Sequence, residues 1–163
     1  MDDEIIDKYY DDKQILLKAL ENDAGELEFA SDALKDDKEV VLTAVKKAGW
    51  VGCYASKRLL ADKDIIMTAA KSDGQVLYYA SEELRADKEV VLIAVKQKPL
   101  IVKYASKELR NDIDVAVTAL ESAIEKYNGP EKGYKKSVYA FLEPEIRQNE
   151  KIQELKKIID EDK

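Results

Sequence analysis

The chain of 163 residues has no histidine and a single cysteine, and these absences narrow the chemistry open to it. Histidine is the commonest general base and metal ligand, so its absence removes every Ser–His and Cys–His dyad. Cys53 alone can form neither an intrachain disulfide nor a zinc site built from several cysteines. We therefore expect a protein that is not an enzyme and that has no cofactor and no bound metal ion.

Long apolar runs are also lacking. No stretch approaches the roughly 20 apolar residues that are needed to cross a bilayer. The first four residues, Met-Asp-Asp-Glu, are acidic and lack the apolar segment of a signal peptide. We therefore expect a cytoplasmic protein with no membrane partner.

An excess of basic charge is missing as well. Acidic residues outnumber basic ones by 34 to 27, which gives a net charge of -7, and the two signs are mixed along the chain. Such a surface makes direct binding of nucleic acid unlikely, because the phosphate backbone requires clustered cations. It does not select a particular partner.

The chain does contain a tandem repeat. Four residue types recur at intervals of 25 residues and in phase with one another, which predicts repeated structural units. The columns are Asp12, Asp37, Asp62, Asp87 and Asp112; Ala30, Ala55, Ala80 and Ala105; Ser31, Ser56, Ser81 and Ser106; and Leu34, Leu59, Leu84 and Leu109.

Each unit predicts two helices, as residues 37–61 illustrate. Asp37 is suited to cap a helix of about three turns, whose apolar residues recur at helical spacing and which ends near Gly49. A shorter second helix would follow from Trp50, and Ser56 would cap a last turn, which the spacing allows to be a 3₁₀ turn. We expect an all-α, right-handed helical-repeat solenoid, with Ala80 buried where adjacent units approach closely.

We interpret residues 1–163 as one domain with modified ends. Residues 1–11 form a partial N-terminal cap, residues 12–111 four repeats, residues 112–148 a fifth repeat and residues 149–163 a C-terminal capping helix. Because Ala140 follows Ala105 by 35 residues, the fifth repeat is expected to contain ten extra residues. Asn128-Gly129-Pro130 predicts that they form an inserted loop at about residues 121–136.

The segment Tyr79-Ala80-Ser81-Glu82-Glu83-Leu84-Arg85-Ala86-Asp87-Lys88-Glu89-Val90-Val91-Leu92 resembles a known repeat family, domain-of-unknown-function family 4116. The resemblance covers roughly residues 12–118. It implies tandem helical repeats, and it brings no established activity, cofactor or catalytic residue.

Most repeated columns have a structural interpretation. The aspartates are expected to cap helices rather than to bind calcium, because their spacing of about 10 Å is too large for one coordination shell. Lys46, Lys71 and Lys96 are interpreted as a solvated face at helix ends, with binding of phosphate or of an acidic partner as the alternative. The aromatic column is expected to be a core stack whose hydroxyl groups reach the surface. Its members are Phe29, Tyr54, Tyr79, Tyr104 and Tyr139.

The columns that differ between repeats are the candidates for recognition. Two such columns lie three positions apart at the start of the second helix, and so on one helix face. Their candidate partner-binding residues are Trp50, Cys53, Tyr78, Leu100 and Lys103. The alternative is that Trp50 folds over its own repeat. Tyr127 and Tyr134, at the expected loop, are a secondary candidate.

The sequence therefore favours a non-enzymatic scaffold that binds another protein through a variable face, as a monomer or weak oligomer. The alternative is an acidic inhibitor or immunity-type protein that blocks a nuclease or a nucleic-acid-binding enzyme. The net charge of -7 permits this alternative, but the interspersed lysines argue against full mimicry of nucleic acid.

Overall fold

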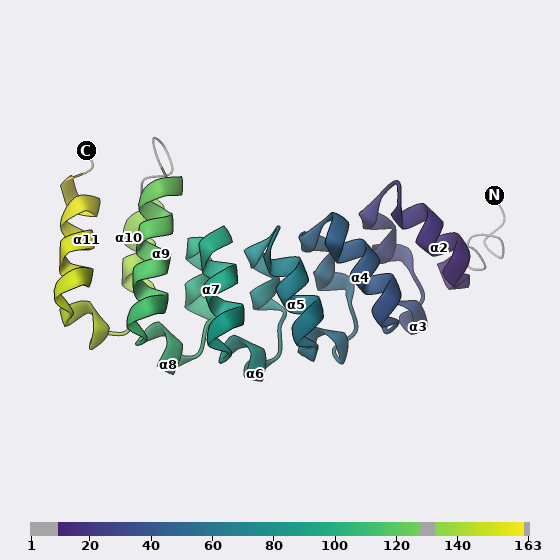
Figure 1. Ribbon diagram of the computed structural model, residues 1–163, viewed down its shortest axis with the longest axis horizontal. Helices are drawn as coiled ribbons and strands as arrows, with labels where there is room; N and C mark the ends of the chain where they lie inside the picture. Colours follow the sequence, from purple (N-terminus) through teal and green to yellow (C-terminus); the bar gives the residue numbers. More distant parts are fainter. Residues whose placement is uncertain (1–9, 128–132, 162–163) are drawn as a thin grey trace.

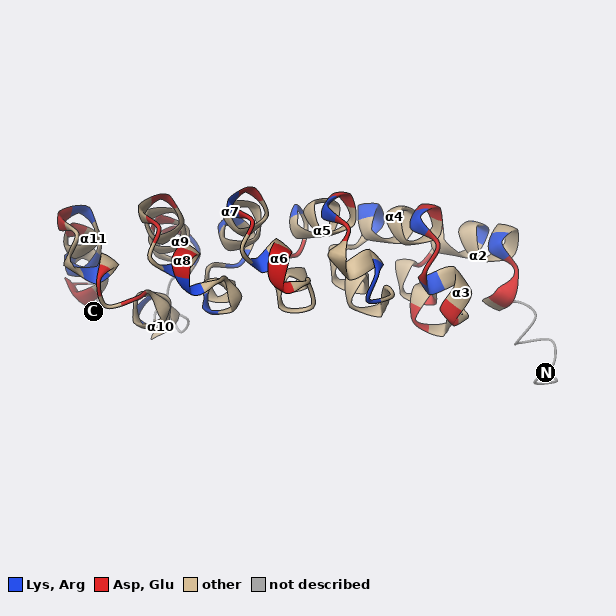
Figure 2. Ribbon diagram, turned by 90° about the horizontal axis from the view of Figure 1, so that it is seen from below, with Lys and Arg blue, Asp and Glu red and all other residues tan. Residues whose placement is uncertain are grey.

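The computed structural model describes residues 10–127 and 133–161, and within these ranges the chain is helical and contains no strand. The helices form an elongated array with the two termini at opposite ends (Figure 1). Seen from below, with the long axis of the array still horizontal, they lie in two layers (Figure 2). The expected all-α helical-repeat solenoid is confirmed.

One layer contains the long helices and the other contains the second element of each repeat. The long helices are α2 (Lys13–Leu20), α4 (Lys38–Lys47), α5 (Lys63–Ala70), α7 (Lys88–Gln97), α9 (Ile113–Lys126) and α11 (Glu150–Glu161). The second layer consists of η1 (Ala24–Phe29), η2 (Gly49–Tyr54), η4 (Gly74–Tyr78), η5 (Pro99–Tyr104) and α10 (Gly133–Phe141). Short turns lead to the next repeat: α3 (Asp32–Lys35), η3 (Leu59–Ala61), α6 (Glu82–Arg85), α8 (Lys107–Arg110) and η7 (Ile146–Gln148).

The second element of the first four repeats is a 3₁₀-helix over its whole length, and not only at its end. Each such element has five or six residues. A 3₁₀-helix rises about 2.0 Å per residue against 1.5 Å in an α-helix, so a short segment crosses the unit only in the more extended form. The fifth repeat has more residues here, and its second element is the nine-residue α-helix α10.

The predicted caps are present. The Asp37 Oδ1 atom accepts hydrogen bonds from the backbone N–H groups of Glu39 (3.0 Å) and Val40 (3.2 Å). The other four aspartates of the column cap α2, α5, α7 and α9 in the same way. Ser31, Ser81 and Ser106 cap the short helices α3, α6 and α8. The 25-residue columns therefore mark the helix starts.

The repeats also alternate in pairs, which the sequence interpretation missed. α2 and α5 have eight residues each, and they are followed by 3₁₀-helices that Asp23 and Asp73 cap. α4 and α7 have ten residues each, and the residues before their 3₁₀-helices, Ala48 and Lys98, make no side-chain cap. The structural period is therefore 50 residues, divided into two similar halves.

A ladder of ion pairs joins the starts of the long helices, and the sequence interpretation missed this feature too. The first residue of four long helices is a lysine that reaches the next repeat. Lys63 Nζ lies 2.8 Å from Asp87 Oδ2 and 2.9 Å from Glu89 Oε2. Lys13, Lys38 and Lys88 form the corresponding pairs with Asp37 and Glu39, Asp62 and Asp64, and Asp112 and Asp114. Acidic and basic segments accordingly lie side by side along this edge (Figure 2). Four of the five capping aspartates, those of α4, α5, α7 and α9, thus use one oxygen within their own helix and the other toward the preceding repeat.

Backbone hydrogen bonds reinforce each junction. The N–H of Ser56 donates to the carbonyl of Lys35 at 2.9 Å, and that of Ser106 donates to Arg85 at 2.9 Å. Ser31 and Ser81 make the same contact with Tyr10 and Leu60. The serine that starts each short turn therefore also ties it to the preceding one.

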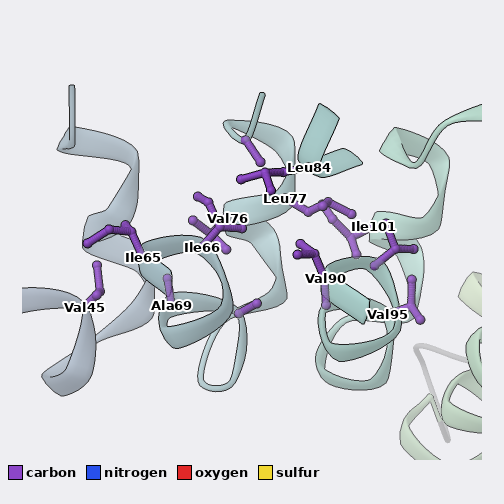
Figure 3. Packing of buried hydrophobic residues seen from close by; sticks show 14 of the residues in the cluster. Val45, Ile65, Ile66, Ala69, Val76, Leu77, Leu84, Val90, Val95 and Ile101 are labelled. Carbon is purple, nitrogen blue, oxygen red and sulfur yellow. The ribbon is translucent and has the colours of Figure 1, made fainter. Parts of the chain in front are cut away.

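The core lies between the two layers and is built from small and branched residues. Val76 and Leu77 of η4 meet Ile66 of α5 and Val90 of α7 there (Figure 3). Ala44, Ala69, Ala94 and Ala119 of the long helices are fully buried, and Ala80 of the second layer is 5% exposed, as expected. Small residues at both columns allow the layers to approach closely.

The C-terminal repeat departs from the expected alignment. Ala140 is exposed, whereas Leu142 is 1% exposed and the N–H of Glu143 donates to the Arg110 carbonyl. Leu142 therefore occupies the alanine column, 37 residues after Ala105 and twelve beyond the period. Most of the expected loop at residues 121–136 is helical, in α9 and α10, while Asn128-Gly129-Pro130 lies outside the described residues.

The ends of the chain can be compared only in part with the expectation. Of the expected N-terminal cap, only Tyr10 and Asp11 are described. The C-terminal helix α11 packs against α9, with Ile152 and Ile159 buried and Leu155 partly buried. Ile158, next to Ile159 in the same helix, is 50% exposed. Among the helices of the described part of the chain, none is both long and apolar enough to span a bilayer.

The close approach of the layers yields a first prediction, for Gly49→Ala. A Cβ atom at Gly49 would lie 2.1 Å from the backbone oxygen of Ala69, so α5 would have to move. We expect Gly49→Ala to lower the free energy of unfolding by about 1–3 kcal/mol in urea melts. Gly133→Ala is the control, because a Cβ there meets no atom within 4 Å, and it should be neutral or slightly stabilising. Equal effects of the two variants would contradict the packing described.

The ion-pair ladder yields a second prediction, which concerns pH. The Lys63 ammonium group lowers the pKa of Asp87 below its usual 3.8. As the pH falls, Asp87 is therefore protonated in the unfolded chain at a higher pH than in the folded protein. The stabilisation that its charge provides is complete above about pH 5 and is lost as the pH falls through the lowered pKa of the folded state. Asp87→Asn keeps a capping oxygen but not the charge, and should cost less than about 1 kcal/mol at pH 7, against about 1–2 kcal/mol for Asp87→Ala.

Urea melts between pH 7 and pH 3 test this prediction. The difference in the free energy of unfolding between the wild type and Asp87→Asn should become smaller as the pH falls, since both proteins then have an uncharged capping residue. If this difference stays constant between pH 7 and pH 3, the charge of Asp87 does not stabilise the fold.

Candidate functional site

The candidate site lies on the outer side of the 3₁₀ layer. In a 3₁₀-helix, residues three apart lie directly above one another. In η2, Gly49 and Gly52 are therefore buried against the long helices, while Trp50 and Cys53 lie on the outward ridge. The sequence interpretation placed these columns on one face, and the 3₁₀ geometry brings them into closer alignment than an α-helix would.

The five candidate residues are all at least partly accessible. Trp50 and Tyr78 are each 48% exposed, Lys103 is exposed, and Cys53 and Leu100 are partly buried. The column 28/53/78/103 runs along the array from acidic Glu28 through Cys53 and Tyr78 to basic Lys103. The ridge therefore changes its chemistry from one end of the array to the other.

The prediction that the aromatic column forms a stack in the core is wrong. Phe29 is 60% exposed and Tyr79 is 41% exposed, while Tyr54, Tyr104 and Tyr139 are partly buried. The reason is the close approach of the layers, since even a methyl group at Gly52 would lie 2.9 Å from a Val76 methyl carbon. The rings therefore find no space between the layers: Phe29 and Tyr79 lie on the outer surface, and the other three pack, partly buried, against the core from outside.

The aromatic side chains contact one another across repeat boundaries. The rings of Tyr78 and Tyr104, from successive repeats, have centroids 4.7 Å apart, and Tyr78 also meets Tyr79 at 4.9 Å. One repeat pair earlier, the Tyr54 hydroxyl donates to a Glu28 carboxylate oxygen at 2.9 Å. We call this surface the aromatic strip. It comprises Phe29, Trp50, Tyr54, Tyr78, Tyr79 and Tyr104.

Trp50 does not fold over its own repeat alone. Its ring contacts Tyr54 of the same repeat edge-on, with centroids 6.1 Å apart. The far edge of the indole also lies beside Gly25 of the preceding repeat, where an added Cβ would be 3.6 Å from it. Gly25 thus leaves space for the indole, and almost half of Trp50 stays accessible.

Cys53 has no environment that would activate it. Partial burial raises the pKa of its thiol, and the carboxylates of Glu28 and Asp73 raise it further. A raised pKa leaves little thiolate at neutral pH, and the thiolate is the reactive form. Cys53 is therefore suited to packing rather than to nucleophilic chemistry.

Tyr127 and Tyr134 form a separate aromatic pair. Their ring centroids lie 5.5 Å apart, at the end of α9 and the start of α10, and Tyr134 is 48% exposed. Lys46, Lys71 and Lys96 are exposed near the ends of the long helices, in agreement with a solvated face. In the described ranges, no three His, Cys, Asp or Glu residues are grouped in a way that could hold a metal ion.

Four members of the strip, namely Phe29, Tyr54, Tyr79 and Tyr104, were expected in the core rather than at the surface. The signal was present in the column directly after the ridge column 28/53/78/103, where aromatic residues recur at positions 29, 54, 79 and 104. Recurrence of an apolar type favoured a core position, and only the 3₁₀ conformation of the layer reveals that the column faces outward.

Comparison with known proteins gives one result. A family model described as Domain of unknown function (DUF4116) matches residues 12–60, 53–85, 62–110 and 87–128, so that the matches together cover most of the chain. Three of the four matches begin at a capping aspartate, and two of them span one 50-residue pair of repeats each. No curated protein and no solved structure matches the chain.

Proposed function

The chain belongs to the DUF4116 family, a repeated domain of unknown function, and on this premise we propose that it is a non-enzymatic scaffold that binds another protein through the aromatic strip. The observation that carries the proposal is the exposure of Trp50 and Tyr78, each 48%, on one face. Phe29 and Tyr79 extend the same accessible surface. Exposed aromatic residues grouped on one face are typical of protein interfaces.

The variation between repeats supports this surface over the others. A solenoid needs the same core in every unit, so recognition has to use positions that the core leaves free. In the ridge columns, Trp50 corresponds to Gly25 and Tyr78 to Glu28. The fold therefore does not require large rings at these two positions.

The acidic inhibitor stays a prediction, and the ion-pair ladder gives it no support. Eight carboxylates at the long-helix starts are paired with four lysines of the preceding repeats. Carboxylates held in this way are less available to imitate a phosphate backbone. The proposal of a scaffold is based on the exposed aromatic rings and does not depend on the net charge.

The third prediction concerns Trp50→Ala and Tyr78→Ala. Each truncation should weaken binding of the partner by about 2 kcal/mol or more, because aromatic anchors at interfaces have effects of that size. Each should lower the free energy of unfolding by less than about 1.5 kcal/mol, because the rings are half exposed and lose mainly edge contacts. Ile158→Ser, at a side chain that is 50% exposed on α11, is the matched control.

Quantitative affinity purification from host cells, followed by calorimetry on the captured protein and by urea melts, measures both effects. A protein retained by the wild type and by Ile158→Ser, but lost with both ring truncations, is the expected result. Retention of the same protein at unchanged affinity by Trp50→Ala and Tyr78→Ala would exclude the aromatic strip as its binding surface.

A further inference from the structure

A basic cleft lies at the junction of the third and fourth repeats, beside one end of the aromatic strip. Its volume is about 320 Å³ and it is formed by the short helices α6 and α8 and by the end of η5. Its charged and aromatic lining consists of Glu82, Arg85, Lys103, Tyr104, Lys107 and Arg110. Four cations thus face one carboxylate, in a chain whose net charge is -7.

The four cations differ in how they are paired: within the described residues, Arg110 has a close carboxylate partner, Arg85 has only a distant one, and the two lysines have none. The guanidinium group of Arg110 is engaged, since it donates to Glu143 Oε1 at 2.8 Å and to the Ala105 carbonyl at 2.7 Å. Arg85 Nη2, in contrast, is 3.9 Å from Glu82, and its buried Nε makes no hydrogen bond in the described part of the chain.

The two lysines are also available. Lys103 Nζ lies over the ring of Tyr104, 4.7 Å from its centroid, and 5.7 Å from that of Phe141. Neither Lys103 nor Lys107 forms an ion pair with any residue in the ranges 10–127 and 133–161. A cation held over an aromatic ring remains free to meet an anion from the other side.

The repeat itself does not require this charge. One unit earlier, the positions of Arg85, Lys103 and Lys107 are occupied by Leu60, Tyr78 and Glu82. The backbone junction is nevertheless the same, because the Ser81 N–H donates to Leu60 as the Ser106 N–H donates to Arg85. The positive charge is therefore a local specialisation of one junction and not a part of the fold.

We propose that this cleft binds the carboxylate groups of an acidic peptide segment of the partner, an inference that rests on the proposed function of the aromatic strip. Tyr104 lines the cleft and contacts Tyr78 of the strip, so the two surfaces are continuous. Arginine and lysine recognise carboxylates through charge-assisted hydrogen bonds, and adjacent rings accept apolar side chains. The partner segment therefore combines glutamate or aspartate with neighbouring apolar residues.

The direction in which the partner segment binds follows from the change of charge along the ridge column 28/53/78/103. Glu28 lies near one end of the strip and Lys103 at the other. The acidic part of the segment lies over the fourth repeat, and its apolar part runs along Tyr78 toward Trp50. A nucleic acid fits less well, because its phosphates need a row of cations, whereas here Tyr78 and Cys53 hold the preceding ridge positions.

The first experiment uses the full chain labelled with ¹⁵N and a defined peptide, acetyl-Glu-Glu-Phe-Glu-Glu-Leu-amide. Titration should shift the amide signals of Arg85, Lys103 and Lys107 together with that of Tyr78. The same peptide with glutamine at every glutamate position should bind at least about tenfold more weakly, and the acidic peptide should weaken as sodium chloride is raised from about 50 to 300 mM. Equal affinity for the two peptides, or tighter binding of a short oligouridine RNA, would overturn the proposal.

The second experiment uses charge reversal at exposed lysines, so that folding is retained. The double variant Lys103→Glu/Lys107→Glu should lose at least about tenfold in affinity for the acidic peptide. Lys46→Glu/Lys71→Glu changes the net charge by the same amount on the long-helix layer and should lose less than about twofold. Equal losses in the two double variants would show a response to net charge and would contradict a site at the cleft.

These experiments are independent of the test of the aromatic strip. If the peptide fails to bind the cleft while Trp50→Ala and Tyr78→Ala still lose the partner, this inference fails and the proposed function stands. If both ring truncations retain the partner, the proposed function fails, whatever the peptide does.

Discussion

The structure depends on the junction between one repeat and the next, and at its centre is an aspartate that makes two kinds of contact. Asp87 caps α7 through one carboxylate oxygen and accepts Lys63 of the preceding repeat through the other. A single side chain thus fixes both where a helix begins and how it sits against its neighbour. A pair of this exposure contributes little alone. Four such lysines in register, together with the serine backbone bonds, define the stacking of the array.

This stacking also determines which positions are available for recognition. Small residues such as Gly49 and Ala69 bring the layers so close together that aromatic rings are displaced to the outer surface. The five- or six-residue second element crosses the unit as a 3₁₀-helix, and its threefold repeat aligns Trp50 and Cys53 on a ridge. The aromatic strip and the basic cleft therefore lie on the outward side of the second layer, whose inward side chains, such as Val76 and Leu77, belong to the core. We propose that recognition uses the outward side of the second layer, whereas stability comes from the core between the two layers and from the junctions between repeats.

Much of this fold could be predicted from the sequence, because caps and apolar columns act locally. The capping role of Asp37, the burial of Ala80 and the family were all correct. The ion pairs of Lys63 and its equivalents could not be inferred from one repeat. Taken alone, a lysine at the start of a helix looks like an ordinary surface residue, and its partners belong to the next repeat. Ala140 was placed in the alanine column because it was the alanine available, whereas Leu142 fills that space in the α-helical version of the second element. The exposure of the aromatic column depends on the distance between the two layers, and the spacing of residues in the sequence does not determine that distance.

The measurement that tests the central claim most directly is hydrogen exchange of individual amides in the wild type and in Lys63→Met. Because the Lys63 contact orders the cap of the following helix, exchange in Lys63→Met should accelerate at the N–H groups of Glu89 and Val90, which donate to Asp87. The corresponding amides of Glu39 and Val40, whose cap is held by Lys13, should exchange as before. Unchanged exchange at Glu89 and Val90, or equal acceleration at both caps, would contradict the claim that each junction is fixed by its own shared aspartate.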